Sequence, residues 1–191
     1  LPPSINYSYS RFVVEEGGIR YSLVSIKNVG AAGYKMIFKE REKGLFKDMY
    51  DFLARIPSLS SKMLESLIDA GAFDEFNKNR AYLRKNISLM MEYIQLGVDE
   101  KPIFEEVREN KMGTQNKFER LEREKEVLGL YISTHPIVYV KQKIKHPLVN
   151  LVDVENYMDR TIPVVCSISS VRAIVDKKGR EMAFIEGQDE T

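Results

Sequence analysis

Short helical segments that end at Gly or Pro make up most of this sequence. From Leu23 to about Ile144 the apolar residues recur every three or four positions, which is the spacing of one buried helix face. The pattern breaks at residues that commonly end helices, namely Gly44, Pro57, Gly71 and Gly97. The sequence therefore predicts a mainly α chain of short helices joined by tight bends.

Capping residues mark several of the predicted helix starts. Ser60 or Ser61 is suited to cap the third helix, and Asp74 is predicted to cap the longer helix that follows. Residues 97–117 lack periodicity and contain Gly and Pro, which predicts a loop or linker. The helical pattern then resumes at Phe118.

Two other segments alternate with the period of a β-strand. The first surrounds Gly17 and Gly18, which suit the positive φ of a hairpin turn. The second begins near Val164, turns at residues 176–179 and returns from Met182. We expect an N-terminal β-hairpin and, after the helices, the first hairpin of a β domain.

Charge and composition limit the classes of function. The 29 Lys and Arg are balanced by 28 Asp and Glu, for a net charge of +1, whereas proteins that coat DNA are usually strongly basic. Any contact with nucleic acid must therefore be local. Apolar runs of membrane-spanning length are missing and there is one cysteine, which favours a soluble cytoplasmic protein without disulfides.

The bend from Lys27 to Ala31 is the strongest candidate for binding. A short helix from Leu23 is predicted to lead into Lys27, Asn28, Val29 and Gly30, and a second helix to start at Ala31. Unpaired amides at that helix start would bind a phosphate oxygen, and Lys27 and Lys35 would each add a positive charge. Such contacts read the nucleic-acid backbone rather than its bases. A plain αα-turn, in which Gly30 only ends a helix, explains these residues equally well.

A second bend of the same kind surrounds Gly71. It carries Asp69 and Asp74 on either side, and these carboxylates would repel a phosphate. We therefore predict that this bend packs against the first one instead of binding DNA.

Catalytic and metal-binding patterns are missing from the sequence. His135 and His146 each precede a Pro, with no second His or Cys at ligand spacing, and are predicted to be turn residues. Acidic residues between Glu100 and Glu126 alternate with Lys and Arg, which predicts a solvated helix face. We assign no catalytic residue, metal ligand or cofactor.

Six blocks of residues, taken together, resemble a known family. They are LPPSIN (1–6), IRYSL (19–23), IKNVG (26–30), LIDAGAFD (67–74), EKEVLGLYISTHP (124–136) and DKKGREMAF (176–184). In this order they resemble the bacterial DNA polymerase III alpha subunit, a replicative C-family DNA polymerase. The resemblance implies the end of the fingers, a tandem helix-hairpin-helix region and the first strands of an OB-fold. It also implies that the catalytic aspartates and their Mg²⁺ lie in a palm domain outside this chain.

The resemblance further implies binding residues. The hairpin with which the family contacts duplex DNA matches Lys27 to Ala31. The family's sliding-clamp motif is expected in the linker, where Ile103 and Phe104 form the apolar pair although the Gln of the motif is missing. A second match, at residues 115–118, has the Gln but a Lys where the motif has an apolar residue. Packing of Ile103 and Phe104 back on the helices explains the apolar pair at least as well. Lys177 and Lys178 of the OB hairpin are expected to contact the DNA backbone.

We therefore expect five segments: residues 1–22 (end of the fingers), 23–97 (tandem helix-hairpin-helix), 98–117 (linker with the clamp motif), 118–160 (connecting helices) and 161–191 (an incomplete OB-fold). The predicted function is duplex binding and processivity, without catalysis, in a replicative DNA polymerase. Its expected partners are double-stranded DNA, single-stranded DNA through the OB portion, the sliding clamp and other replisome subunits, but no membrane. The abrupt ends of the sequence suggest an excerpt. Two alternatives are a free-standing structure-specific DNA-binding module and a structural segment that never touches DNA.

Overall fold

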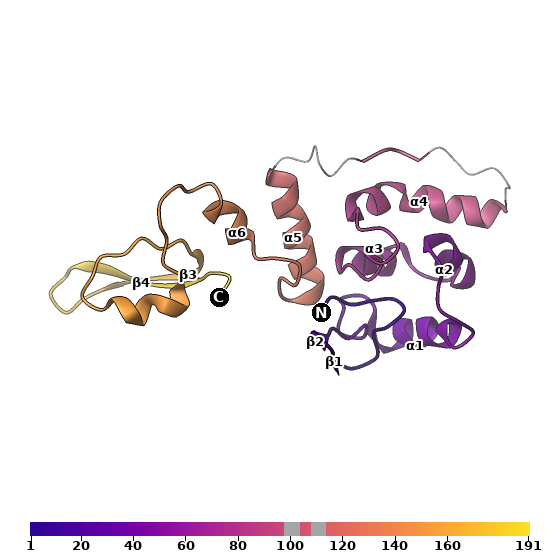
Figure 1. The fold of residues 1–191 in the computed structure, drawn as a ribbon, viewed down its shortest axis with the longest axis horizontal. Helices are drawn as coiled ribbons and strands as arrows, with labels where there is room; N and C mark the ends of the chain where they lie inside the picture. Colours follow the sequence, from indigo (N-terminus) through magenta and orange to yellow (C-terminus); the bar gives the residue numbers. More distant parts are fainter. Residues whose placement is uncertain (98–103, 108–113) are drawn as a thin grey trace. The chain divides into compact units, whose positions relative to one another are not determined.

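The computed structural model describes residues 1–97, 104–107 and 114–191, which divide into two units (Figure 1). The first unit, Leu1–Ser133, contains β1 (Val13–Glu15), β2 (Gly18–Arg20), α1 (Gly30–Arg41), α2 (Met49–Arg55), α3 (Ser61–Asp69), α4 (Arg80–Leu96) and α5 (Thr114–Leu128). The second unit, Thr134–Thr191, contains α6 (Pro136–Lys141), the 3-10 helix η2 (Leu151–Tyr157), β3 (Ser167–Val175) and β4 (Glu181–Gln188). The expected fold class, mainly α with a β-hairpin at each end, is confirmed.

The N-terminal hairpin forms where it was predicted. β1 and β2 pair antiparallel, with Val14 opposite Ile19. Gly17 and Gly18 adopt φ values of 92° and 145°, which side chains with a Cβ rarely reach. The two glycines therefore correctly indicated the position of the turn.

The core of the first unit draws on distant parts of the chain. Phe52 of α2 and Phe73 of the second bend are buried, with ring centroids 4.9 Å apart in an edge-to-face arrangement. Ile5 from the N-terminal segment and Leu128 from the end of α5 belong to the same cluster. The first and second bends share this core through Val29 and Phe73, as their predicted packing requires.

Residues 23–29 form turns instead of the predicted short helix. The amide of Leu23 donates to the carbonyl of Tyr9 at 3.0 Å, and the amide of Lys27 donates to the carbonyl of Val127 at 2.9 Å. In a helix that began at Leu23, the amide of Lys27 would donate to the carbonyl of Leu23; it donates to Val127 instead. The predicted short helix was wrong because the carbonyls that accept these hydrogen bonds are far away in the sequence, where local periodicity cannot reveal them.

Two helix starts also differ from expectation. α4 begins at Arg80, where Asn79 accepts a hydrogen bond from the amide of Tyr82, so Asp74 is not its cap. Asp74 instead forms an ion pair with Arg80. α5 begins at Thr114, ahead of the predicted Phe118, and thus takes up the end of the predicted linker.

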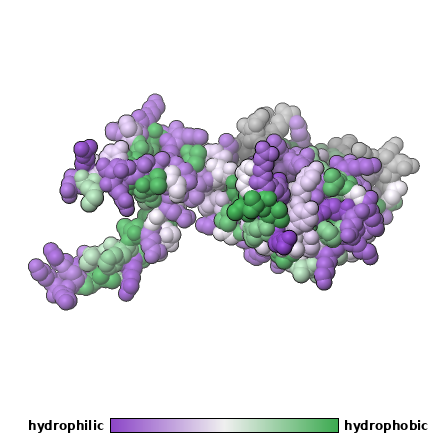
Figure 2. Space-filling view, turned by 60° about the horizontal axis from the view of Figure 1, so that its bottom comes forward, coloured by the Kyte–Doolittle hydropathy of each residue, from purple (hydrophilic) through white to green (hydrophobic). Residues whose placement is uncertain are grey.

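The second unit begins inside the segment that was expected to connect two domains. Pro136 occupies the first turn of α6, as predicted, and His135 is the extended N-cap of that helix where a turn residue was predicted. β3 starts at Ser167 and pairs antiparallel with β4 around the predicted turn at residues 176–179. This hairpin carries exposed apolar side chains (Figure 2), namely Ile168, Val171, Val175, Met182, Phe184 and Ile185.

Candidate nucleic-acid interface

The first bend reverses the hand of the backbone twice in three residues. Asn28 has a φ of 67°, Val29 is right-handed helical and Gly30 has a φ of 59°. Alternation of this kind is found in backbone nests, whose successive N–H groups point to one side and can bind an anion; here the amide of Val29 is already bonded to the carbonyl of Ile26, which leaves the amides after it. A Cβ on Gly30 would meet nothing within 4 Å, so the positive φ, and not lack of space, favours glycine here.

The N-terminus of α1 lacks the cap that other helices of this chain have. Side chains of Asp48, Ser60, Asn79 and His135 cap α2, α3, α4 and α6. Val29, at the equivalent position before α1, makes no side-chain hydrogen bond, and the first turn of α1 carries no acidic residue. Gly30 and Ala31 are exposed, so their amides are accessible to an anion at the positive end of the helix.

The other residues of the bend hold its shape. Asn28 donates from its side-chain amide to Ser66 Oγ of α3 at 2.9 Å. Val29 is buried, and its own amide donates to the carbonyl of Ile26. Both were predicted as binding residues, and the structure gives the side-chain amide of Asn28 and the backbone amide of Val29 partners within the protein. Ser66 has no signal in the sequence that would have revealed this role.

The two predicted lysines differ in their surroundings. Lys35 is exposed on α1. Lys27 Nζ lies 2.7 Å from Glu126 Oε1 of α5, and about half of each side chain remains exposed. The hydrogen bond and the charge of Lys27 lower the pKa of Glu126. Lys27, which was predicted to contact a phosphate, therefore already forms an ion pair with a carboxylate of the protein.

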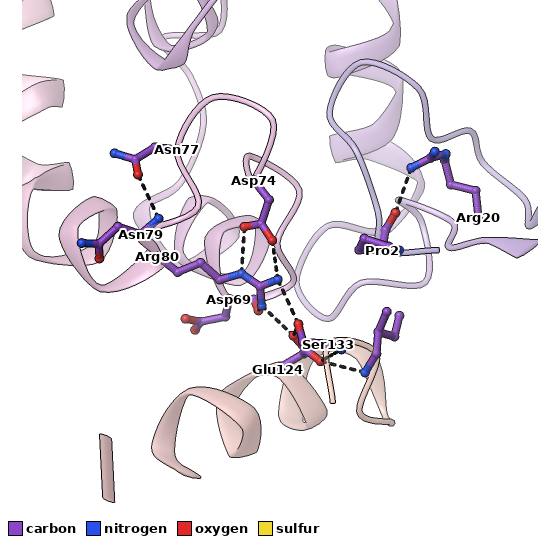
Figure 3. Close-up of polar contacts among 10 residues, drawn as sticks. Pro2, Arg20, Asp69, Asp74, Asn77, Asn79, Arg80, Glu124 and Ser133 are labelled. Carbon is purple, nitrogen blue, oxygen red and sulfur yellow. Dashed lines mark hydrogen bonds and ion pairs between the residues drawn. The ribbon is translucent and has the colours of Figure 1, made fainter. Parts of the chain in front are cut away.

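The carboxylates beside the second bend are paired with arginines of the same unit (Figure 3). Gly71 adopts a φ of 82°, and Arg80 forms two hydrogen bonds with Asp74. Asp69 is paired with Arg84 at 2.6 Å. These carboxylates are used to hold the helices together, in accord with a packing role for this bend.

Glu124 of α5 corrects the expectation that the acidic residues before Glu126 form a solvated face. Its side chain is 1% exposed and lies 2.6 Å from Arg80 Nη1. Burial by itself would raise the pKa of Glu124, but hydrogen bonds from Ser133 and Arg80 outweigh it and lower that pKa. Local charge alternation does not reveal which carboxylate meets a buried arginine.

Of the two predicted clamp-binding residues, Ile103 lies outside the described residues. Phe104 is partly buried against the core of the first unit. The centroid of its ring lies 6.1 Å from that of Tyr50 and 6.4 Å from that of Tyr82. The neighbouring residue Glu105 exchanges both of its backbone hydrogen bonds with the buried side chain of Asn86. This short segment is thus attached to α4.

Lys177 and Lys178 lie in the turn of the second unit's hairpin. Both are exposed. Asp176 accepts from the amides of Lys178 and Arg180 and forms an ion pair with Arg180. The turn is therefore internally ordered, with both lysine side chains directed to solvent.

Metal ligands and membrane spans were searched for over the described part of the chain. No three His, Cys, Asp or Glu side chains there are grouped to hold a metal ion. In the same residues no helix is both long and apolar enough to cross a membrane.

Known proteins are similar to this chain over its whole length. A helix-hairpin-helix motif family matches residues 1–83. The DNA polymerase III subunit alpha of Bacillus subtilis (strain 168) is 38% identical over 208 residues, which cover 100% of this chain and 18% of that protein. Those of Staphylococcus aureus (strain N315) and Staphylococcus epidermidis (strain ATCC 12228) are 34% and 33% identical, and each match covers 99% of this chain. The chain spans 18% of the length of these relatives. It is therefore homologous, over its whole length, to one segment of the DNA polymerase III alpha subunit.

Proposed function

We propose that this chain is a duplex-DNA-binding segment of a bacterial replicative DNA polymerase and that its first bend contacts the phosphate backbone. One observation carries the proposal: among the α-helices whose N-cap is described, α1 alone lacks a side-chain cap, and it follows a bend of alternating backbone hand. The homology to polymerase subunits supports the choice of DNA as the anion.

The contact would need few charges. Amides of Gly30 and Ala31 would donate to one phosphate, with Lys27 and Lys35 beside them. Because these groups meet phosphates only, binding would be independent of sequence, as a polymerase requires. A net charge of +1 is compatible with such a local contact.

The finer parts of the function are proposals of the same kind. The intact enzyme would join deoxynucleotides with Mg²⁺ held by residues outside this chain, and this segment would contribute position and processivity. Ile103 and Phe104 would bind the sliding clamp, which requires Phe104 to leave its place between Tyr50 and Tyr82. Lys177 and Lys178 would contact single-stranded DNA.

A salt titration of duplex binding tests the central proposal. We would compare the complete polymerase subunit with its Lys27→Glu, Lys35→Glu variant, and use Lys47→Glu, an exposed lysine just before α2, as a control for net charge. The double variant should bind more weakly, with a slope of log affinity against log salt lower by about one per lost phosphate contact.

The same measurement separates the alternatives. Because the double variant changes the net charge twice as much as Lys47→Glu, a loss of binding free energy no larger than twice that of Lys47→Glu would show a general charge effect and contradict the proposed contact. Unchanged affinity and slope in the double variant would favour a structural segment that does not touch DNA.

A further inference from the structure

The Lys27–Glu126 ion pair joins the first bend to the end of α5. The Nζ–Oε1 distance is 2.7 Å, and the side chains keep 51% and 65% of their exposure. Both groups therefore remain in water, where an ion pair is weak and exchanges partners easily.

Glu126 lies in a basic environment. Besides Lys27, the charges of Arg84 on α4 and Lys62 on α3 act on its carboxylate and lower its pKa. Arg84 is itself paired with Asp69 and Glu65, whereas Lys62 is exposed at the start of α3. The geometric contact is the one with Lys27, and a carboxylate oxygen 2.7 Å from its ammonium group occupies a position that also suits a phosphate oxygen.

The ion pair is not needed to position the backbone of the bend. The amide of Lys27 is already held by the carbonyl of Val127 at 2.9 Å, and Asn28 is held by Ser66. Removing the carboxylate of Glu126 would leave both bonds in place. What Glu126 controls is the ammonium group of Lys27.

We propose that Glu126 is an internal competitor of DNA: its carboxylate occupies Lys27 in the free protein and is displaced by a backbone phosphate when duplex binds. The inference rests on the proposed function of the first bend and adds a regulatory residue to it. The competition weakens the grip on DNA by the free energy needed to break the pair. A polymerase that must slide along its template benefits from a contact that exchanges easily.

Duplex affinity of the complete polymerase subunit tests the competition. The variants are Glu126→Gln, Lys27→Gln and the two combined, with Glu119→Gln as control, because Glu119 is an exposed carboxylate on the same helix. Glu126→Gln should tighten binding about two- to fivefold at low salt, the range of an exposed ion pair. Glu119→Gln should change affinity much less.

The combined variant distinguishes competition from general repulsion. In the Lys27→Gln background, Glu126→Gln should no longer tighten binding, because the competed group is gone. The competition is overturned if the gain persists in that background. It is also overturned if Glu126→Gln leaves affinity unchanged or weakens it while Lys27→Gln weakens binding; in that case the DNA contact itself stands. If Lys27→Gln has no effect, the proposed contact of Lys27 and the competition both fail.

Discussion

Arg80 Nη1 donates a hydrogen bond of 2.6 Å to Glu124 Oε2, and the two side chains are only 4% and 1% exposed. Glu124 Oε1 accepts from the amides of Ile132 and Ser133 at 2.7 Å. Arg80 also reaches Asp74 and the carbonyl of Asp69. The pair therefore joins α4, α5 and the second bend through groups that all have partners, which is the condition under which a buried ion pair is tolerated.

Breaking this pair from one side should be costly. We expect Arg80→Met to lower the free energy of unfolding by about 3–5 kcal/mol, because Glu124 and Asp74 would be left without their buried cation. Urea denaturation of the single variants Arg80→Met and Glu124→Leu and of the double variant measures the coupling. The double variant should be more stable than the sum of the single effects predicts, by about 1–3 kcal/mol; strict additivity would contradict the coupling.

The same carboxylate should contribute to acid unfolding. The folded pKa of Glu124 lies below its ordinary value of 4.5, so its stabilisation is complete above that value and is lost as pH falls through 4.5 toward the folded pKa. Thermal melts between pH 7 and pH 3 should show a steeper fall in stability below pH 4.5 for the wild type than for Glu124→Gln. Parallel curves for the two proteins would contradict this assignment.

Gly71 should tolerate alanine worse than another glycine with nearly the same φ. Gly71 and Gly129 have φ values of 82° and 80°. A Cβ on Gly71 would lie 2.7 Å from Arg80 Cζ and 2.9 Å from Asp74 Oδ2, whereas one on Gly129 would meet nothing within 4 Å. Both substitutions carry a backbone cost of about 1–2 kcal/mol.

We expect Gly71→Ala to cost about 1–3 kcal/mol more than Gly129→Ala, because the Arg80 guanidinium must move away from its carboxylates. Equilibrium unfolding of both variants is the measurement. Equal losses of unfolding free energy in the two variants would mean that the Arg80 side chain can move away at no cost, and would contradict the prediction.

The cap of α3 gives a prediction with a neighbouring control. Ser60 accepts a hydrogen bond from the amide of Met63 at 3.2 Å, while Ser61 is exposed in the first turn. Ser60→Ala should lower the free energy of unfolding by about 1 kcal/mol, and Ser61→Ala should change it by less than about 0.5 kcal/mol. Reversed effects would place the cap at Ser61, the other residue that the sequence allowed.

Local chemistry was enough to predict most of the secondary structure. Glycine and proline act through their own backbone preferences, so their effect can be predicted without knowing the fold. Examples are Gly17 and Gly18 in the first hairpin, Gly97 after α4 and Pro136 at the start of α6. The position of the first bend followed from Gly30 in the same way. A resemblance carried by six blocks pointed to the same DNA polymerase III alpha subunit to which the whole chain is homologous.

Tertiary structure decided what the charged residues do. Glu124 and Glu126 lie two positions apart in one helix and have the same chemistry, yet one is buried against Arg80 and the other is exposed beside Lys27. Residues two apart on a helix point to different faces, and which face meets which cation depends on how α5 packs. Residues 23–29 likewise form a bend and not the predicted helix, because the amides of Leu23 and Lys27 donate to the carbonyls of Tyr9 and Val127. Local preference acts on neighbouring residues, whereas an ion pair or a long-range hydrogen bond exists only after folding has brought its two ends together.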